Sequence, residues 1–181
     1  GAICIREGVN IPALICGGGQ ESGKRSGTEN VPAIAGFGLA AEMSEHGRRE
    51  NSASMAQMRQ RLISQLTASL DDIVINSPET AGENAGECCS SLLNISFLGT
   101  RGEVLLHTLE QDGIYVSTGS ACSSNKKGQS HVLKAMGLKD KEIEGTLRFS
   151  FGRMNSIEEI DIAADKVAAA VKRFRRLGSF R

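Results

Sequence analysis

Cys122 is the residue of this sequence best suited to nucleophilic chemistry. It lies in residues 117–124, Ser-Thr-Gly-Ser-Ala-Cys-Ser-Ser, where every other side chain is small, and Lys126 and Lys127 follow shortly after. A cysteine in a polar, flexible and locally cationic loop is commonly exposed and ionises readily to the thiolate, the form that attacks electrophiles. From composition alone, a turn with an incidental cysteine is the simpler interpretation, so the loop needs support from other parts of the chain.

Arg148 is a second group with chemical potential. Residues 146–151 alternate strictly, which predicts a strand with Leu147, Phe149 and Phe151 facing the core. Arg148 then points the other way, on a rigid element that suits bidentate binding of a carboxylate. An arginine on a solvated sheet face fits the same pattern equally well.

Residues 16–28 are rich in glycine, hydroxyl groups and basic side chains, and they could bind a phosphate through backbone N–H groups. Gly18, Gly23 and Lys24 have the spacing of a nucleotide-binding P-loop, but Arg25 stands where that signature requires serine or threonine. A P-loop would bind ATP and would begin a helix at Arg25. The other interpretation is a long glycine-rich connection.

Composition excludes several classes of function. Lys+Arg and Asp+Glu number 21 each in 181 residues, so no net charge favours nucleic acid, and no apolar run is long enough for a membrane. The five cysteines form no C-x-x-C pair and the three histidines have no zinc-ligand spacing, which predicts no metal site and fits a reducing cytoplasm. Cys4 and the Cys88-Cys89 pair lie on or beside expected strands, where we expect burial to slow their reactions.

The elements that must position these groups follow from apolar spacing. The pattern predicts strands over residues 2–6, 73–76, 92–97 and 146–151, and helices over 31–70, 103–111, 131–136 and from Ser156 onward. Gly47 and the polar residues after it predict a joint between two helices within 31–70. Ser156 and Glu159 have the spacing of a capping box. The order of elements predicts an α+β fold, with helices covering one face of a small, mostly antiparallel sheet.

Three motifs together resemble the C-terminal part of the cysteine desulfurases, in the class V aminotransferase group of pyridoxal-phosphate (PLP) enzymes. They are Gly-Gly-Gly-Gln-Glu (17–21) with Arg-Ser-Gly-Thr-Glu-Asn (25–30), Ser-Thr-Gly-Ser-Ala-Cys-Ser-Ser (117–124), and Leu-Arg-Phe-Ser-Phe-Gly-Arg (147–153). The resemblance covers nearly the whole chain and is closest to the nitrogen-fixation and iron–sulfur-cluster branch. It implies a fold-type I PLP-dependent transferase, with the tail of the large domain at 1–30, connecting helices at 31–70 and the small domain at 71–181.

The resemblance also implies a role for four residues. Cys122 would accept sulfur from L-cysteine as a persulfide and release L-alanine, Arg148 would bind the substrate carboxylate, and Asn94 would line the substrate pocket. Thr28 would reach the PLP phosphate of the partner subunit, which implies a homodimer. The implied sulfur acceptor is a protein such as an iron–sulfur scaffold, and the implied location is the cytoplasm.

The family's PLP-linking lysine has no counterpart in this sequence. Lys24, Lys126 and Lys127 stand in the wrong motifs, and the first residues already have a strand-like pattern. We therefore expect a chain that starts within a domain, binds no PLP covalently and is inactive by itself. The alternatives are another class V enzyme, such as a selenocysteine lyase or an aminotransferase, and a non-enzymatic sulfur carrier or interaction module.

Overall fold

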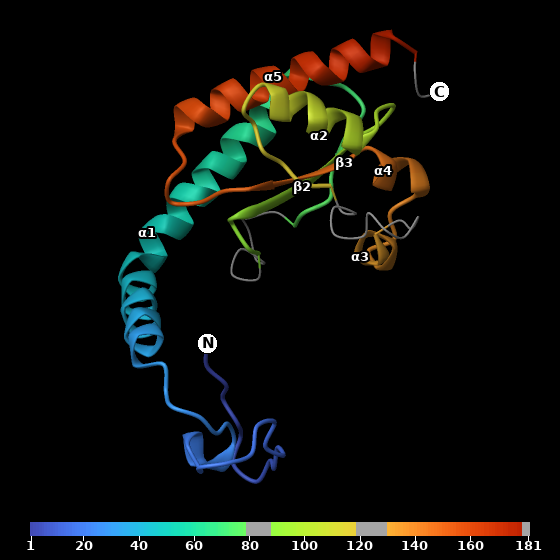
Figure 1. The fold of residues 1–181 in the computed structure, drawn as a ribbon. Coiled ribbons are helices and arrows are strands. Elements are labelled where there is room, and N and C mark those ends of the chain that lie inside the picture. The colour runs from blue at the N-terminus through green and yellow to red at the C-terminus, as the bar shows by residue number, and fades with distance from the viewer. Residues whose placement is uncertain (79–87, 119–129, 179–181) are drawn as a thin grey trace. The chain divides into compact units, whose positions relative to one another are not determined.

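The computed structural model describes residues 1–78, 88–118 and 130–178 (Figure 1). Contacts divide the chain into two compact units, Gly1–Arg48 and Arg49–Arg181. Helix α1 (Val31–Ser69) runs through this boundary. In the described residues, no helix combines the length and the apolar character that crossing a membrane requires.

A three-stranded antiparallel sheet forms the centre of the C-terminal unit. Its strands are β1 (Ile73–Ile75), β2 (Leu92–Phe97) and β3 (Thr146–Ser150), in the order β1-β2-β3. One face is apolar because side chains alternate along each strand, and it contributes fully buried residues to the core: Leu93, Ile95, Phe97 and Leu147. The sheet and its helices confirm the predicted α+β class.

Three helices pack on the apolar face of the sheet (Figure 1). They are the C-terminal part of α1, then α2 (Gly102–Gln111) and α5 (Ile157–Arg176). Each presents one apolar stripe to the core, as amphipathic spacing requires, and the buried positions include Leu62, Leu66, Leu105, Leu109, Val167 and Val171. Two short helices, α3 (His131–Ala135) and α4 (Asp140–Glu144), precede β3 in the chain, and α4 lies at the end of the sheet where β3 begins.

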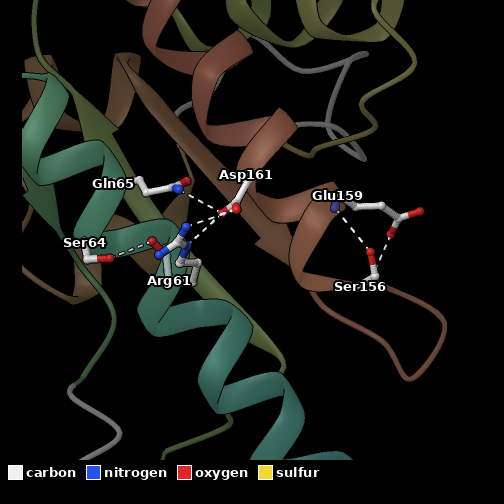
Figure 2. Close-up of polar contacts among 6 residues, drawn as sticks. All are labelled: Arg61, Ser64, Gln65, Ser156, Glu159 and Asp161. Atoms are coloured by element: carbon white, nitrogen blue, oxygen red, sulfur yellow. Dashed lines mark hydrogen bonds and ion pairs between the residues drawn. The ribbon is translucent and has the colours of Figure 1, made fainter.

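Polar contacts tie α5 to α1 and define where α5 begins (Figure 2). Arg61 donates two hydrogen bonds to the Asp161 carboxylate, at 2.7 and 3.0 Å, and Gln65 donates a third at 2.8 Å. The hydroxyl of Ser156 accepts from the Glu159 N–H, and the Glu159 carboxylate accepts from the Ser156 N–H. The predicted capping box is therefore confirmed.

The expected strand over residues 2–6 is wrong. Ile3 and Ile5 are 73% and 36% exposed, and no strand forms there. Alternating residues become a strand only when a neighbouring strand supplies hydrogen-bond partners. None of the strands in the described ranges pairs with these residues.

The expected joint between two helices is also wrong, because α1 continues through Gly47 without interruption. A glycine inside a helix costs only about 1 kcal/mol relative to alanine. The residues around it are good helix formers, and Arg48 pairs with Glu45 at 3.0 Å, one turn earlier. Favourable neighbours outweigh the single glycine here.

Candidate active site

A row of four polar residues crosses the sheet on the face opposite the core. Asn94 of β2 lies opposite Arg148 of β3. On one side the Asn76 N–H donates to the Asn94 carbonyl at 2.9 Å, and on the other Ser117 exchanges two backbone hydrogen bonds with Arg148, at 3.0 and 2.7 Å. We call Asn76, Asn94, Arg148 and Ser117 the polar row. It brings together residues that are far apart in the sequence.

Arg148 is positioned by the buried residues on either side of it. Leu147 and Phe149 are 0% and 5% exposed and anchor β3 in the core, whereas Arg148 is exposed. Among the described residues, the Arg148 guanidinium has no hydrogen-bond or ion-pair partner. Because a guanidinium matches a carboxylate through two parallel hydrogen bonds, this arrangement suits binding of a carboxylate substrate.

Asn94 is half-buried and held by the segment that follows β1. Its Oδ1 accepts from Asn76 Nδ2 at 2.7 Å, and its backbone N–H donates to Ser77 Oγ at 2.8 Å. The sequence did not single out Asn76 or Ser77. The only available signal was their place at the end of a predicted strand, which Asn76 closes and Ser77 follows, and their role depends on strand pairing.

Ser117 connects the polar row to the predicted nucleophile. It pairs with Arg148 as an isolated antiparallel bridge, and it precedes Cys122 by five residues. Cys122 itself lies outside the described residues. Ser117 is thus anchored directly beside the strand that carries the exposed guanidinium.

Thr28 lies in the N-terminal unit, and it is exposed. Backbone contacts shape the loop before it: the Ser26 N–H donates to the Ile15 carbonyl at 3.0 Å, and the Gly27 N–H donates to Gln20 Oε1 at 3.1 Å. The side chain of Thr28 therefore follows a closed loop and remains available to a ligand.

The structure contradicts the P-loop alternative. That signature requires a helix beginning at Arg25, but the loop holds only the 3₁₀ turn η1 (Glu21–Gly23), and the next helix begins at Val31. Lys24 does not reach toward a phosphate site either. Its ammonium donates to the Ile11 carbonyl at 2.7 Å and to Asn10 Oδ1 at 3.2 Å.

The expected burial of the other cysteines is wrong. Cys4 and Cys89 are exposed, as is Cys16, and Cys88 is half-buried. Cys4 is exposed because no strand forms around it, and Cys89 precedes β2 in a surface turn. Hydrogen bonds from the hydroxyl and the backbone N–H of Ser91 lower the pKa of the Cys89 thiol, and the nearby Arg59 charge adds a smaller effect.

The sequence profile of the aminotransferase class-V family matches residues 12–162. The chain belongs to the class V aminotransferase family. No group of three or more potential metal ligands occurs in the described part of the chain.

Its relatives within the family are named as cysteine desulfurases. Cysteine desulfurase IscS of Clostridium botulinum is 38% identical over 177 residues, which cover 98% of this chain and 44% of that protein. Cysteine desulfurase IscS of Methanosarcina thermophila is 39% identical over 178 residues, covering 98% of this chain and 42% of that protein. The chain thus spans less than half the length of these relatives.

Solved structures show the same fold. A NifS-like protein matches with a TM-score of 0.78 at 35% identity, covering 93% of this chain and 41% of that one. A NifS-like protein from Rickettsia africae matches with a TM-score of 0.74 at 27% identity, covering 91% and 41%. The match extends through both units, each of which has its counterpart in these class V structures.

Class V aminotransferases use PLP, and the described residues fit one edge of that cofactor. Thr28 offers an exposed hydroxyl at the end of a closed glycine-rich loop, which is suitable for a phosphate oxygen. Lys24 is held by two oxygens and does not suit a covalent link to the cofactor. The chain's own residues therefore fit the role of a phosphate ligand better than that of a cofactor anchor.

Proposed function

We propose that this chain is the C-terminal part of a PLP-dependent cysteine desulfurase. The enzyme would take sulfur from L-cysteine as a persulfide on Cys122 and release L-alanine. The observation that carries the proposal is the backbone pairing of Ser117 with Arg148. It joins the strand that bears the exposed guanidinium to a residue five positions before Cys122 in the sequence, which supports a carboxylate site and a thiol that act on one substrate.

Four residues of the chain have separate roles in the proposed reaction. Arg148 binds the substrate carboxylate through two hydrogen bonds, and Asn94 lines the same pocket. The Cys122 thiolate attacks the substrate sulfur: the S–S bond forms while the C–S bond breaks, and its electron pair stays on the carbon skeleton, which takes up a proton to give alanine. When bound, PLP supplies the electron sink for this cleavage. Thr28 holds the cofactor phosphate of the partner subunit in a homodimer.

The domain assignment follows from the same proposal. Residues 1–30 belong to the tail of the PLP-binding large domain, residues 31–70 connect, and residues 71–181 form the small domain with the catalytic loop. The enzyme works in the cytoplasm and passes its sulfur to an acceptor protein, such as an iron–sulfur scaffold. The relatives' names as cysteine desulfurases support the activity from which this assignment follows.

Other class V activities fit the observations less well. A transaminase needs no thiol in the position of Cys122, and the Gly-Ser-Ala-Cys-Ser-Ser setting of Cys122 also speaks for a desulfurase rather than a selenocysteine lyase. A non-enzymatic sulfur carrier would use Cys122 but would have no need for Arg148 on the polar row.

The test uses the intact protein that carries this chain, loaded with PLP. With L-cysteine it should produce alanine and a persulfide on Cys122, and Cys122→Ser should abolish the persulfide while keeping the absorbance of bound PLP. For the chain by itself, borohydride reduction after incubation with PLP should leave its mass unchanged. No alanine from the intact protein, or a persulfide in the Cys122→Ser variant, would overturn the proposal.

A further inference from the structure

A chain of hydrogen bonds leads from helix α4 across the sheet to Asn94. Thr146 Oγ1 donates to the Glu142 carbonyl at 2.7 Å and lies 3.2 Å from Ser96 Oγ. Asn76 Nδ2 lies 2.8 Å from Ser96 Oγ and 2.7 Å from Asn94 Oδ1. Ser96 and Thr146 are 0% and 1% exposed, so water does not replace these contacts.

Each contact has only one possible direction. The Glu142 carbonyl has no proton, so Thr146 must donate to it with its single hydroxyl hydrogen. Thr146 Oγ1 can then only accept from Ser96, so the Ser96 hydroxyl donates its single hydrogen to Thr146. In its contact with Asn76, the Ser96 hydroxyl can therefore only accept.

The direction continues to Asn94. Asn76 must present its NH₂ group to Ser96, because Ser96 has no hydrogen left to give. The second hydrogen of that NH₂ group then faces Asn94, which must present Oδ1 in return. The helix carbonyl at one end thereby determines which way the Asn94 amide lies at the other.

This orientation decides what Asn94 offers to a ligand. With Oδ1 held by Asn76, Nδ2 points away from Asn76, and no described residue accepts a hydrogen bond from it. Arg148 lies opposite Asn94 on the adjacent strand and also presents only donors. The opposite amide orientation would place a carbonyl oxygen beside the guanidinium and would repel an anion.

We propose that Thr146, Ser96 and Asn76 are positioning residues that hold the Asn94 amide with its NH₂ group toward the substrate carboxylate beside Arg148. The inference rests on the proposed function, because it assumes that a carboxylate substrate binds at the polar row. It adds a second donor to the carboxylate site and assigns a role to three residues that do not contact the substrate.

The decisive comparison is Thr146→Val against Thr146→Ser in the PLP-loaded intact protein. Valine keeps the shape of threonine but removes the oxygen that accepts from Ser96. The Ser96 hydroxyl then donates to Asn76 Oδ1 instead, because its hydrogen would otherwise have no acceptor. This change reverses the side-chain amides of both Asn76 and Asn94. We expect the KM for L-cysteine to rise roughly 10-fold, the loss of one hydrogen bond to a charged group. The kcat should change little, and Thr146→Ser should retain the wild-type KM.

The result separates three outcomes. An unchanged KM in a folded Thr146→Val variant would mean a merely structural role and would overturn the inference. If Thr146→Val does not fold, the test uses Asn76→Asp instead. A carboxylate at position 76 can only accept, so Asn94 must turn its Nδ2 toward residue 76 and away from the substrate. An unchanged KM in that variant would also overturn the inference. Absence of turnover in the wild-type protein would instead overturn the proposed function.

A second readout needs no activity. In the ¹⁵N-labelled chain, sodium acetate should shift the side-chain NH₂ resonances of Asn94, relative to sodium chloride at the same ionic strength. The shift should be lost in Thr146→Val and kept in Thr146→Ser. A response to acetate that is equal in all three proteins would contradict the proposed orientation.

Discussion

Asn94 and Arg148 lie directly opposite each other on neighbouring antiparallel strands, and both face away from the hydrophobic core. Their neighbours along each strand, Leu93 and Leu147, are fully buried on the other face. The same alternation that builds the core therefore presents an amide and a guanidinium side by side. Packing and the proposed substrate binding occupy separate faces of one sheet, so substitutions can separate the two.

Arg148→Ala should impair activity with little effect on stability, whereas Leu147→Ala should lower the stability of the fold. Arg148 is exposed, so its truncation should leave the melting temperature nearly unchanged while impairing turnover at low cysteine in the intact protein. Leu147 is 0% exposed, and its truncation should cost about 2–5 kcal/mol through the cavity it leaves. Thermal melting and steady-state kinetics of both variants check this; unchanged turnover in Arg148→Ala would contradict the carboxylate clamp.

Cys89 should remain reactive at lower pH than an ordinary thiol. The Ser91 hydroxyl and N–H lower its pKa, and alkylation follows the fraction of thiolate. The midpoint of the iodoacetamide rate against pH should move up in Ser91→Ala, measured by peptide mass. Cys16 is also exposed and serves as the internal control, whose profile should not respond to this substitution.

Cys122 is expected to label before the other cysteines when iodoacetamide is limiting near neutral pH. Lys126 and Lys127 follow Cys122 closely in the sequence, and we expect their charges to favour its thiolate, although solvent screens part of the effect. Because Cys4, Cys16 and Cys89 are exposed, burial no longer protects the competitors, and the comparison tests intrinsic reactivity. Peptide mapping at partial labelling decides; slower labelling of Cys122 than of Cys4 would refute the activated-loop argument.

The Arg61–Asp161 pair should stabilise the fold in a pH-dependent way. The hydrogen bond from Arg61 lowers the pKa of Asp161, so the contribution is present above the ordinary aspartate pKa of about 3.9 and is lost as pH falls through the lowered value. Asp161→Asn should therefore be less stable than wild type at pH 7, and the difference should shrink in strong acid. Urea unfolding at both pH values measures it, and a difference independent of pH would contradict the pair's role.

Two glycine-to-alanine substitutions should change the stability of the fold in opposite directions. A Cβ at Gly102 would lie 2.5 Å from the Thr146 carbonyl oxygen and 3.3 Å from Thr118 Cγ2, so Gly102→Ala should destabilise the start of α2. A Cβ at Gly38, inside α1, meets nothing within 4 Å. Gly38→Ala should stabilise the helix by about 0.5–1 kcal/mol. Denaturant unfolding of the two variants checks the contrast. Equal effects on stability would contradict the prediction, because they would mean that the backbone shifts to make room for a Cβ at Gly102 at no cost.

The sequence by itself determined the elements whose patterns are local. Strict alternation around Arg148 predicted β3 and the face that Arg148 occupies, and Ser156 with Glu159 marked the start of α5, because both signals involve residues only a few positions apart. The three motifs, of which one contains Cys122, together indicated the family for the same reason: each is a short run of residues that can be recognised without a fold.

Tertiary structure decided everything that depends on a distant partner. The pattern of residues 2–6 did not become a strand because no strand pairs with it, and Gly47 did not break α1 because its neighbours favour a helix. Asn76, Ser96 and Thr146 had no recognisable pattern, since their hydrogen bonds run across strands 20 and 50 residues apart. Only strand register, set by burial of the opposite face, joins them to Asn94 and Arg148.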